Sequence, residues 1–151
     1  MRTILLLAAL VAASAFAQGS IFPDKTTKKV AKQFEANSIS EDVRAFLQVK
    51  MKNHAKEMKD LSVAVAVVNF VDVQKLAQDI ANSPRLDPAV GPSAKLPARF
   101  FELQDLEKKS AQELADTAKA GEMTNTLEKY GQLVEQCMAC HAAFKTTVKG
   151  K

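Results

Sequence analysis

The stretch Cys137-Met138-Ala139-Cys140-His141 lies near the C-terminal end of the sequence, late in an apolar pattern of helical period. Two thiols with two residues between them, followed directly by a histidine, are the pattern of a c-type haem attachment site. The spacing suits the chemistry, because two sulfurs can add across the two vinyl groups of one haem while the next imidazole binds the iron. We therefore expect Cys137 and Cys140 to carry one covalent haem c, with His141 as axial ligand.

Three other interpretations of the two cysteines have less support. A thioredoxin-like redox pair occurs near a βαβ pattern, and none is visible here. A structural zinc site needs four ligands, for which Cys137, Cys140 and His141 would have to join the distant His54. A disulfide between Cys137 and Cys140 would be strained over so short a helical span. The haem interpretation is favoured over all three.

The N-terminus predicts export. Met1-Arg2-Thr3 gives a charged start, residues 4–13 are apolar, and Ala15-Phe16-Ala17 supplies small residues for cleavage, as in a secretory signal peptide. The apolar run is shorter than the roughly 20 residues that span a bilayer. We expect residues 1–17 to be removed, leaving a periplasmic protein with no membrane span, which agrees with haem attachment outside the bacterial cytoplasmic membrane.

The charge distribution does not indicate that the protein binds nucleic acid. The whole chain has 21 Lys and Arg residues against 17 Asp and Glu residues. Several lysines gather in the lead-in of residues 18–39, but no aromatic residues alternate with them, so a solvated arm is favoured over a nucleic-acid patch. This arm could also steer an acidic redox partner protein. These lysines are Lys25, Lys28, Lys29 and Lys32.

Residues 40–68 predict a first long helix. Ser40 is a plausible N-cap, and the two acidic residues after it suit the helix dipole. Apolar positions recur in steps of four and three, which is typical of one helix face in a bundle. This predicted inner face consists of Leu47, Met51, His54, Met58, Leu61, Val65 and Val68.

Three further helices follow. Asp72 can cap a helix over 73–82, which Pro84 ends. Residues 84–97 hold four of the five prolines and predict the long connection. Pro97 suits the first turn of a third helix that ends at Gly121.

Asn125 and Glu128 suggest a capping box for the fourth helix, which carries the haem motif. One mature domain, residues 40–151, is therefore expected to be all-α, an antiparallel four-helix bundle with haem bound covalently to its C-terminal helix.

With these features the chain resembles the class II cytochromes c, which comprise cytochrome c′ and its low-spin, methionine-ligated relatives. The resemblance covers most of the mature chain and rests on the haem motif in the last helix. It also rests on the spacing of Met51-Lys52, Met58-Lys59 and Leu61 in the first helix. One departure is Leu47, where cytochrome c′ often has an arginine; Arg44 lies one turn earlier.

The resemblance implies that Met51 lies over the distal face of the iron, as the sixth ligand. A thioether ligand raises the reduction potential of haem, which suits electron transfer, although methionines on helices also serve simply as packing residues. The rival is His54, one turn further along, whose ligation would give a lower potential. An open distal site is the third alternative.

We expect a periplasmic monohaem electron carrier that passes single electrons between redox partner proteins. The alternative is a five-coordinate, cytochrome c′-like protein that binds nitric oxide or carbon monoxide. A peroxidase would need distal acid–base groups, for which only His54 qualifies, so no enzymatic activity is expected. The resemblance also suggests a homodimer through the first two helices, although packing within one chain explains the apolar residues 63–71 equally well.

Overall fold

The computed structural model describes residues 39–144, and over this range the chain is helical without strands. The long helices are α2 (Glu41–Ala66), α3 (Phe70–Asn82), α5 (Ala98–Ala120) and α6 (Met123–Phe144). Between α3 and α5 lie a 3₁₀ turn, η2 (Pro88–Val90), and the short helix α4 (Gly91–Ala94). The expectation of an all-α protein is confirmed for these residues. The predicted leader, the lead-in up to residue 38 and the segment after Phe144 lie outside them.

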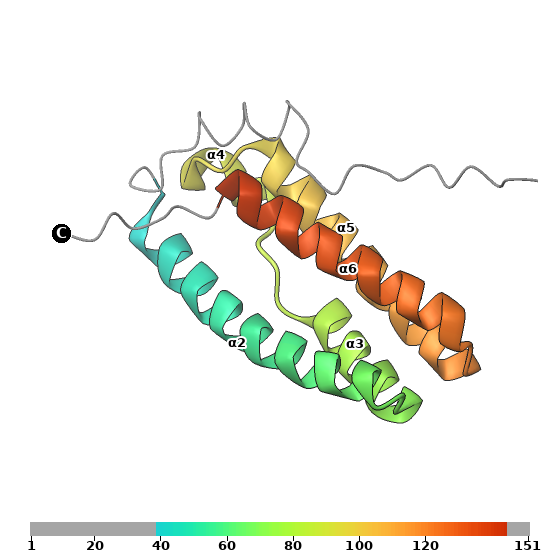
Figure 1. Ribbon diagram of the computed structural model, residues 1–151. Coiled ribbons are helices and arrows are strands. Elements are labelled where there is room, and N and C mark those ends of the chain that lie inside the picture. The colour runs from blue at the N-terminus through green and yellow to red at the C-terminus, as the bar shows by residue number, and fades with distance from the viewer. Residues whose placement is uncertain (1–38, 145–151) are drawn as a thin grey trace, which may run out of the picture.

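The long helices form a bundle-like arrangement (Figure 1). Helices α5 and α6 make an antiparallel pair, α3 packs against α5, and α2 packs chiefly against α3. The connection that carries α4 lies beside the C-terminal end of α6, where the haem motif is found. No helix within residues 39–144 is both long enough and apolar enough to cross a membrane.

The break between α2 and α3 differs from the prediction. Helix α2 ends at Ala66, and Val68 adopts a left-handed conformation with φ of 56°. The side chain of Asn69 then caps α3 by accepting a hydrogen bond from the backbone N–H of Asp72. The predicted cap at Asp72 is therefore wrong, because Asp72 already lies in the first turn of α3 and Asn69 reaches the free N–H groups first.

The boundaries of α5 and α6 follow the sequence more closely. Gly121 ends α5 in the left-handed conformation, with φ of 71°, as its position predicts. Pro97 stands directly before the first residue of α5. The predicted capping box is wrong, because α6 begins at Met123 and Asn125 lies inside its first turn, where its side-chain amide donates to Glu122.

Two apolar clusters hold these helices together. The larger joins the C-terminal half of α2 to α3, α5 and α6, and the smaller joins the N-terminal ends of α2 and α5 to the connection and to the end of α6. The larger cluster contains Leu61, Ala64, Val73, Ala77, Ile80, Ala81, Ala111, Leu114, Ala115, Ala118 and Leu133. The smaller contains Ile39, Ala94, Leu96, Phe100 and Phe101, with Val43, Leu47, Leu86 and Phe144 packed against it.

Candidate functional site

The haem motif occupies the last two turns of α6. At 3.6 residues per turn, Cys137, Cys140 and His141 fall within an arc of about 100° of the helix. Both cysteine side chains are half-buried and are not joined in a disulfide. Cys137 packs against the larger apolar cluster, whereas the side chain of His141 is exposed. The helix thus presents two thiols and one imidazole on one face, as their spacing predicts.

Both thiols are held in the protonated form. Burial, assisted by the carboxylate of Glu107, raises the pKa of Cys137 and of Cys140 to about 11. Attack on a disulfide and zinc binding both require a thiolate, which a raised pKa disfavours. Within residues 39–144, no group of three or more His, Cys, Asp and Glu side chains could hold a metal ion. Neither the redox-pair nor the zinc interpretation gains support.

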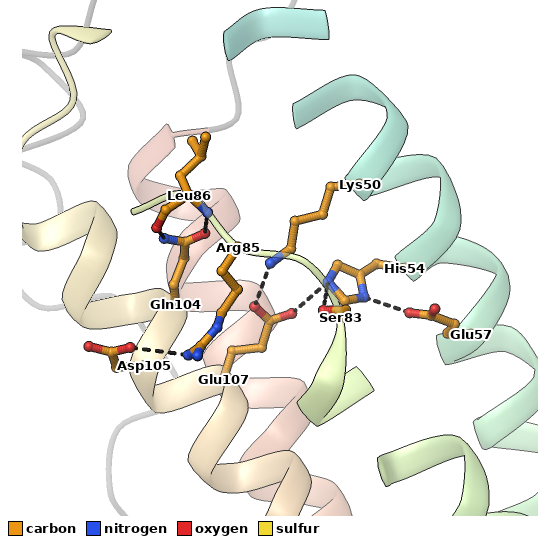
Figure 2. Close-up of polar contacts among 9 residues, drawn as sticks. All are labelled: Lys50, His54, Glu57, Ser83, Arg85, Leu86, Gln104, Asp105 and Glu107. Atoms are coloured by element: carbon orange, nitrogen blue, oxygen red, sulfur yellow. Dashed lines mark hydrogen bonds and ion pairs between the residues drawn. The ribbon is translucent and has the colours of Figure 1, made fainter. Parts of the chain in front are cut away.

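A buried polar cluster, formed by Lys50, His54, Glu57 and Glu107, lies between α2 and α5 (Figure 2). Imidazole Nδ1 of His54 lies 2.8 Å from Oε2 of Glu57, and its Nε2 lies 3.1 Å from Oε1 of Glu107. The hydroxyl oxygen of Ser83 is 3.5 Å from the same Nε2. His54 is only 8% exposed, so these contacts are made largely away from water.

Lys50 is the incompletely paired member of this cluster. It is 7% exposed, and its Nζ lies 3.8 Å from Oε2 of Glu107, without a hydrogen-bond partner among the described residues. Burial lowers the pKa of Lys50, while Glu107 acts in the opposite direction. A buried amine with a distant counter-charge is costly. It would gain from an anionic group placed beside it.

The connection after α3 is tied to α5 close to this cluster. The side-chain amide of Gln104 accepts from the backbone N–H of Leu86 at 3.3 Å and donates to its carbonyl at 3.4 Å. Arg85 donates to Asp105 at 3.2 Å. Figure 2 shows these contacts next to Lys50 and Glu107. They fix the connection against α5, so that the buried polar cluster has a defined border.

The cluster separates the two apolar clusters on each helix that it meets. Along α2, Val43 and Leu47 pack with the smaller cluster, Lys50 and His54 follow, and Leu61 belongs to the larger. Helix α5 shows the same order, with Phe100 and Phe101 before Gln104 and Glu107 and the alanine- and leucine-rich residues 111–118 after them.

Helix α6 passes through the same order in reverse. Leu133 and Cys137 belong with the larger cluster, and Phe144 packs with the smaller. Cys140 and His141 stand between them, at the level of the buried polar cluster. Electrostatic interactions of Cys140 with Lys50 and Glu107 agree with this placement. The polar and thiol side chains of α2, α5 and α6 therefore lie at one level of an otherwise apolar interior.

Other residues singled out in the sequence have packing roles. Met58 packs against the larger apolar cluster, and the hydroxyl of Tyr130 lies 2.8 Å from that of Ser62. The ring of Phe144 meets that of Phe100 edge to face, with centroids 5.4 Å apart. Met51, the predicted sixth ligand, is 39% exposed, and Val68 is also exposed, so the predicted inner face of α2 is wrong at both positions.

Sequence reasoning missed Lys50 and Glu107. The helical spacing places each of them on a buried face. Lys50 stands four residues before His54, and Glu107 stands four residues before the buried Ala111. Neither was predicted to lie in the interior, because charged residues are almost never fully buried unless paired. Their pairing involves different helices, which periodicity within one helix does not reveal.

The residues present fit a covalently attached haem. Two protonated thiols and an imidazole share one helix face, and a buried cation with an incomplete set of partners lies at the same level. Haem carries two anionic propionates and needs thiols, an axial nitrogen and an apolar surround. Comparisons with protein families, with curated proteins and with solved structures find no match for this chain.

Proposed function

We propose that this protein is a periplasmic c-type cytochrome, a four-helix bundle with one haem c, which carries single electrons between redox partner proteins. The observation that carries the proposal is the position of Cys137, Cys140 and His141 on one face of α6, at the level of the buried polar cluster. When bound, haem supplies a one-electron ferric–ferrous couple. The leader sequence of residues 1–17 supports the periplasmic location.

Each residue of the motif has a defined task. The thiols of Cys137 and Cys140 would each add across one vinyl group, with the sulfur bonded to one vinyl carbon and the thiol hydrogen to the other, so that nothing is lost. Nitrogen of His141 would bind the iron from one side. The side chain of His141 is exposed on this face of α6.

The surrounding residues suit an electron carrier. The two apolar clusters lie on both sides of the site and would exclude water from the iron. The ammonium of Lys50 would find in a propionate the hydrogen-bond acceptor that it lacks among the described residues. A site whose groups are fixed by packing and hydrogen bonds reorganises little when one electron arrives or leaves.

The test is to produce the full chain, leader included, in a bacterium that has the apparatus for attaching haem c. We expect periplasmic protein that stays coloured on a denaturing gel and stains for haem peroxidase activity. The matched control is Cys137→Ser/Cys140→Ser, which should be secreted but colourless. A colourless wild type would overturn the proposal, and a ferrous spectrum that shifts with carbon monoxide would replace the carrier by a gas-binding protein.

A further inference from the structure

We infer that His54 is the group that meets the haem iron from the side opposite His141, and that Glu57 is its positioning residue. The inference rests on the proposed function and deepens it, because it selects the second ligand. It replaces the sequence-based prediction that Met51 has this role.

The first argument is the hydrogen bond behind the ring. Nδ1–H of His54 can donate to Oε2 of Glu57, 2.8 Å away and one turn along α2. A histidine that ligates a metal almost always donates its other ring nitrogen to a carboxylate, a carbonyl or a water. The contact with Glu57 fixes the ring orientation, and it gives Nδ1–H an acceptor when Nε2 binds a metal.

The second argument is where Nε2 points. It faces Glu107 of α5 at 3.1 Å (Figure 2). The charge of Glu107 also acts on the thiols of Cys137 and Cys140. The nitrogen is therefore directed into the same interior level as the haem motif. To bind a metal, Nε2 must exchange its contact with Glu107 for the metal and offer its lone pair, while Nδ1–H keeps Glu57 as its acceptor.

The third argument is the orientation of α2. Its buried face runs through Lys50, His54 and Leu61. At 3.6 residues per turn, Met51 is rotated by about 100° from Lys50 and by about 60° from His54. The 39% exposure of Met51 agrees with this geometry. Ligation by Met51 would require α2 to rotate, which would carry Lys50 away from the interior.

Ligand exchange at Nε2 leaves Glu107 with a counter-charge in the buried polar cluster. Glu107 lies 3.8 Å from Lys50 through its other oxygen. When Nε2 is withdrawn, the carboxylate retains the lysine ammonium as counter-charge, and no carboxylate is left buried alone. The chain therefore contains a partner for each charge that the exchange releases.

The test uses the haem-loaded, full-length protein and its optical and electron paramagnetic resonance spectra. We expect a six-coordinate, low-spin ferric form without the weak far-red charge-transfer band of an iron–methionine bond. His54→Ala should become high-spin and should return to low-spin on addition of free imidazole. His54→Met should restore six-coordination with the far-red band and a higher reduction potential.

Met51→Leu should keep the wild-type spectrum, as should Met58→Leu, the packing control on the same helix.

The role of Glu57 is tested through the reduction potential. A carboxylate hydrogen-bonded to Nδ1 makes the imidazole more basic, so Glu57→Gln should raise the potential while leaving the iron low-spin. Asp60→Asn, which removes a carboxylate from an exposed position of α2, is the matched control and should leave the potential nearly unchanged. Equal shifts in both variants would rule out a positioning role for Glu57.

The outcomes separate the two proposals. Covalent haem together with a low-spin form that survives in His54→Ala but is lost in Met51→Leu would overturn the inference and leave the cytochrome in place. A high-spin wild type would likewise overturn it, since the iron would then have no second protein ligand. Colourless protein would overturn the proposed function, and the inference with it. If His54→Ala does not accumulate, the wild-type far-red band decides, because its presence is incompatible with two histidine ligands.

Discussion

The Lys50 side chain ends in a buried amine that makes no hydrogen bond within the described residues, although Glu107 lies 3.8 Å away. The desolvated ammonium is only partly compensated, which is why burial lowers its pKa. A lysine with a lowered pKa in the folded state costs stability wherever it is charged. This cost falls as the pH rises from the folded pKa toward the ordinary value of 10.5, because the unfolded state then binds more protons.

Replacing Lys50 by an apolar side chain of similar length should therefore stabilise the chain without haem. We predict that Lys50→Met raises the free energy of unfolding in urea by about 1 kcal/mol at neutral pH, because Glu107 keeps His54 as its partner. The gain should shrink as the pH approaches 10.5. Lys52→Met, at an exposed position of α2, is the control and should change stability by less than about 0.5 kcal/mol. A clear loss of stability in Lys50→Met would mean that the Lys50–Glu107 pair holds α2 in place.

The two thiols give a second prediction at the scale of single residues. With pKa values of about 11, Cys137 and Cys140 of the haem-free chain should react slowly with iodoacetamide at neutral pH, and the rate should rise until about pH 11. The folded state favours the neutral thiols, so their contribution to stability is present below about pH 9 and is lost as the pH rises through 11.

The measurement is the alkylation rate followed by mass spectrometry, with the urea-unfolded chain as reference. Glu107→Gln removes the carboxylate that raises both pKa values, so its alkylation profile should move to lower pH. A wild-type rate that levels off near pH 9, as in the unfolded chain, would contradict the burial of the thiols.

At this scale, the sequence predicts those functional groups whose arrangement depends only on residue spacing within one helix. Cys137, Cys140 and His141 are recognised by the spacing of the haem attachment motif, and the positions i, i+3 and i+4 share a helix face whatever the rest of the fold does. Apolar residues that recur in steps of four and three predict that Met51 lies on the inner face. The structure turns Lys50 inward instead, since its amine meets Glu107 from another helix, and no pattern within residues 40–68 records that partner.

At the scale of elements, the link between α2 and α3 contains an unusual conformation. Val68 has φ of 56°, a left-handed region that a β-branched residue rarely adopts. The link contains neither glycine nor proline to mark where the first helix ends, and the predicted helix is two residues too long at this end. Several residues could also have capped the next helix, and only the direction in which the chain turns selects Asn69 over Asp72.

The left-handed backbone conformation of Val68 predicts that a glycine at this position stabilises the protein. We expect Val68→Gly to raise the free energy of unfolding by about 1 kcal/mol, because glycine adopts positive φ without the Cβ penalty and little burial is lost at this exposed position. Val67→Gly is the matched control, since Val67 is also exposed but has φ of −96°. It should lower stability by about 0.5–1 kcal/mol. Thermal unfolding of both variants measures these changes. Equal destabilisation of the two variants would contradict the left-handed conformation of Val68.

At the scale of the whole molecule, periodicity predicted the long helices, their order and the long connection between the second and the third. These follow from local patterns of apolar residues, prolines and caps. The two short helical segments in the connection, and the division of the interior into two apolar clusters, were not predicted. Both depend on how distant segments meet: Phe144 at the end of α6 packs with Phe100, and Gln104 binds the backbone of Leu86.

This division of the interior implies that parts of α2 differ in stability. The C-terminal part of the helix contributes Leu61 and Ala64 to the larger apolar cluster, whereas the preceding turns bury Lys50 and His54. Polar burial stabilises a helix less than apolar burial does, and segments with few apolar contacts open first. In the haem-free chain, amide hydrogens of residues 41–57 should therefore exchange faster than those of residues 58–66 and of the α5 residues 111–118.

If a haem bridges α6 and the buried polar cluster, it should remove this difference. We predict that residues 41–57 exchange on the order of tenfold or more slowly in the haem-loaded protein than in Cys137→Ser/Cys140→Ser, while residues 111–118 change little. The reason is that the larger apolar cluster is already complete without the cofactor, whereas His54 and Lys50 would each gain a partner. Hydrogen exchange followed by mass spectrometry resolves the two segments. Uniform slowing along the whole chain would indicate general stabilisation instead, and slowing confined to α6 would mean that α2 does not face the haem.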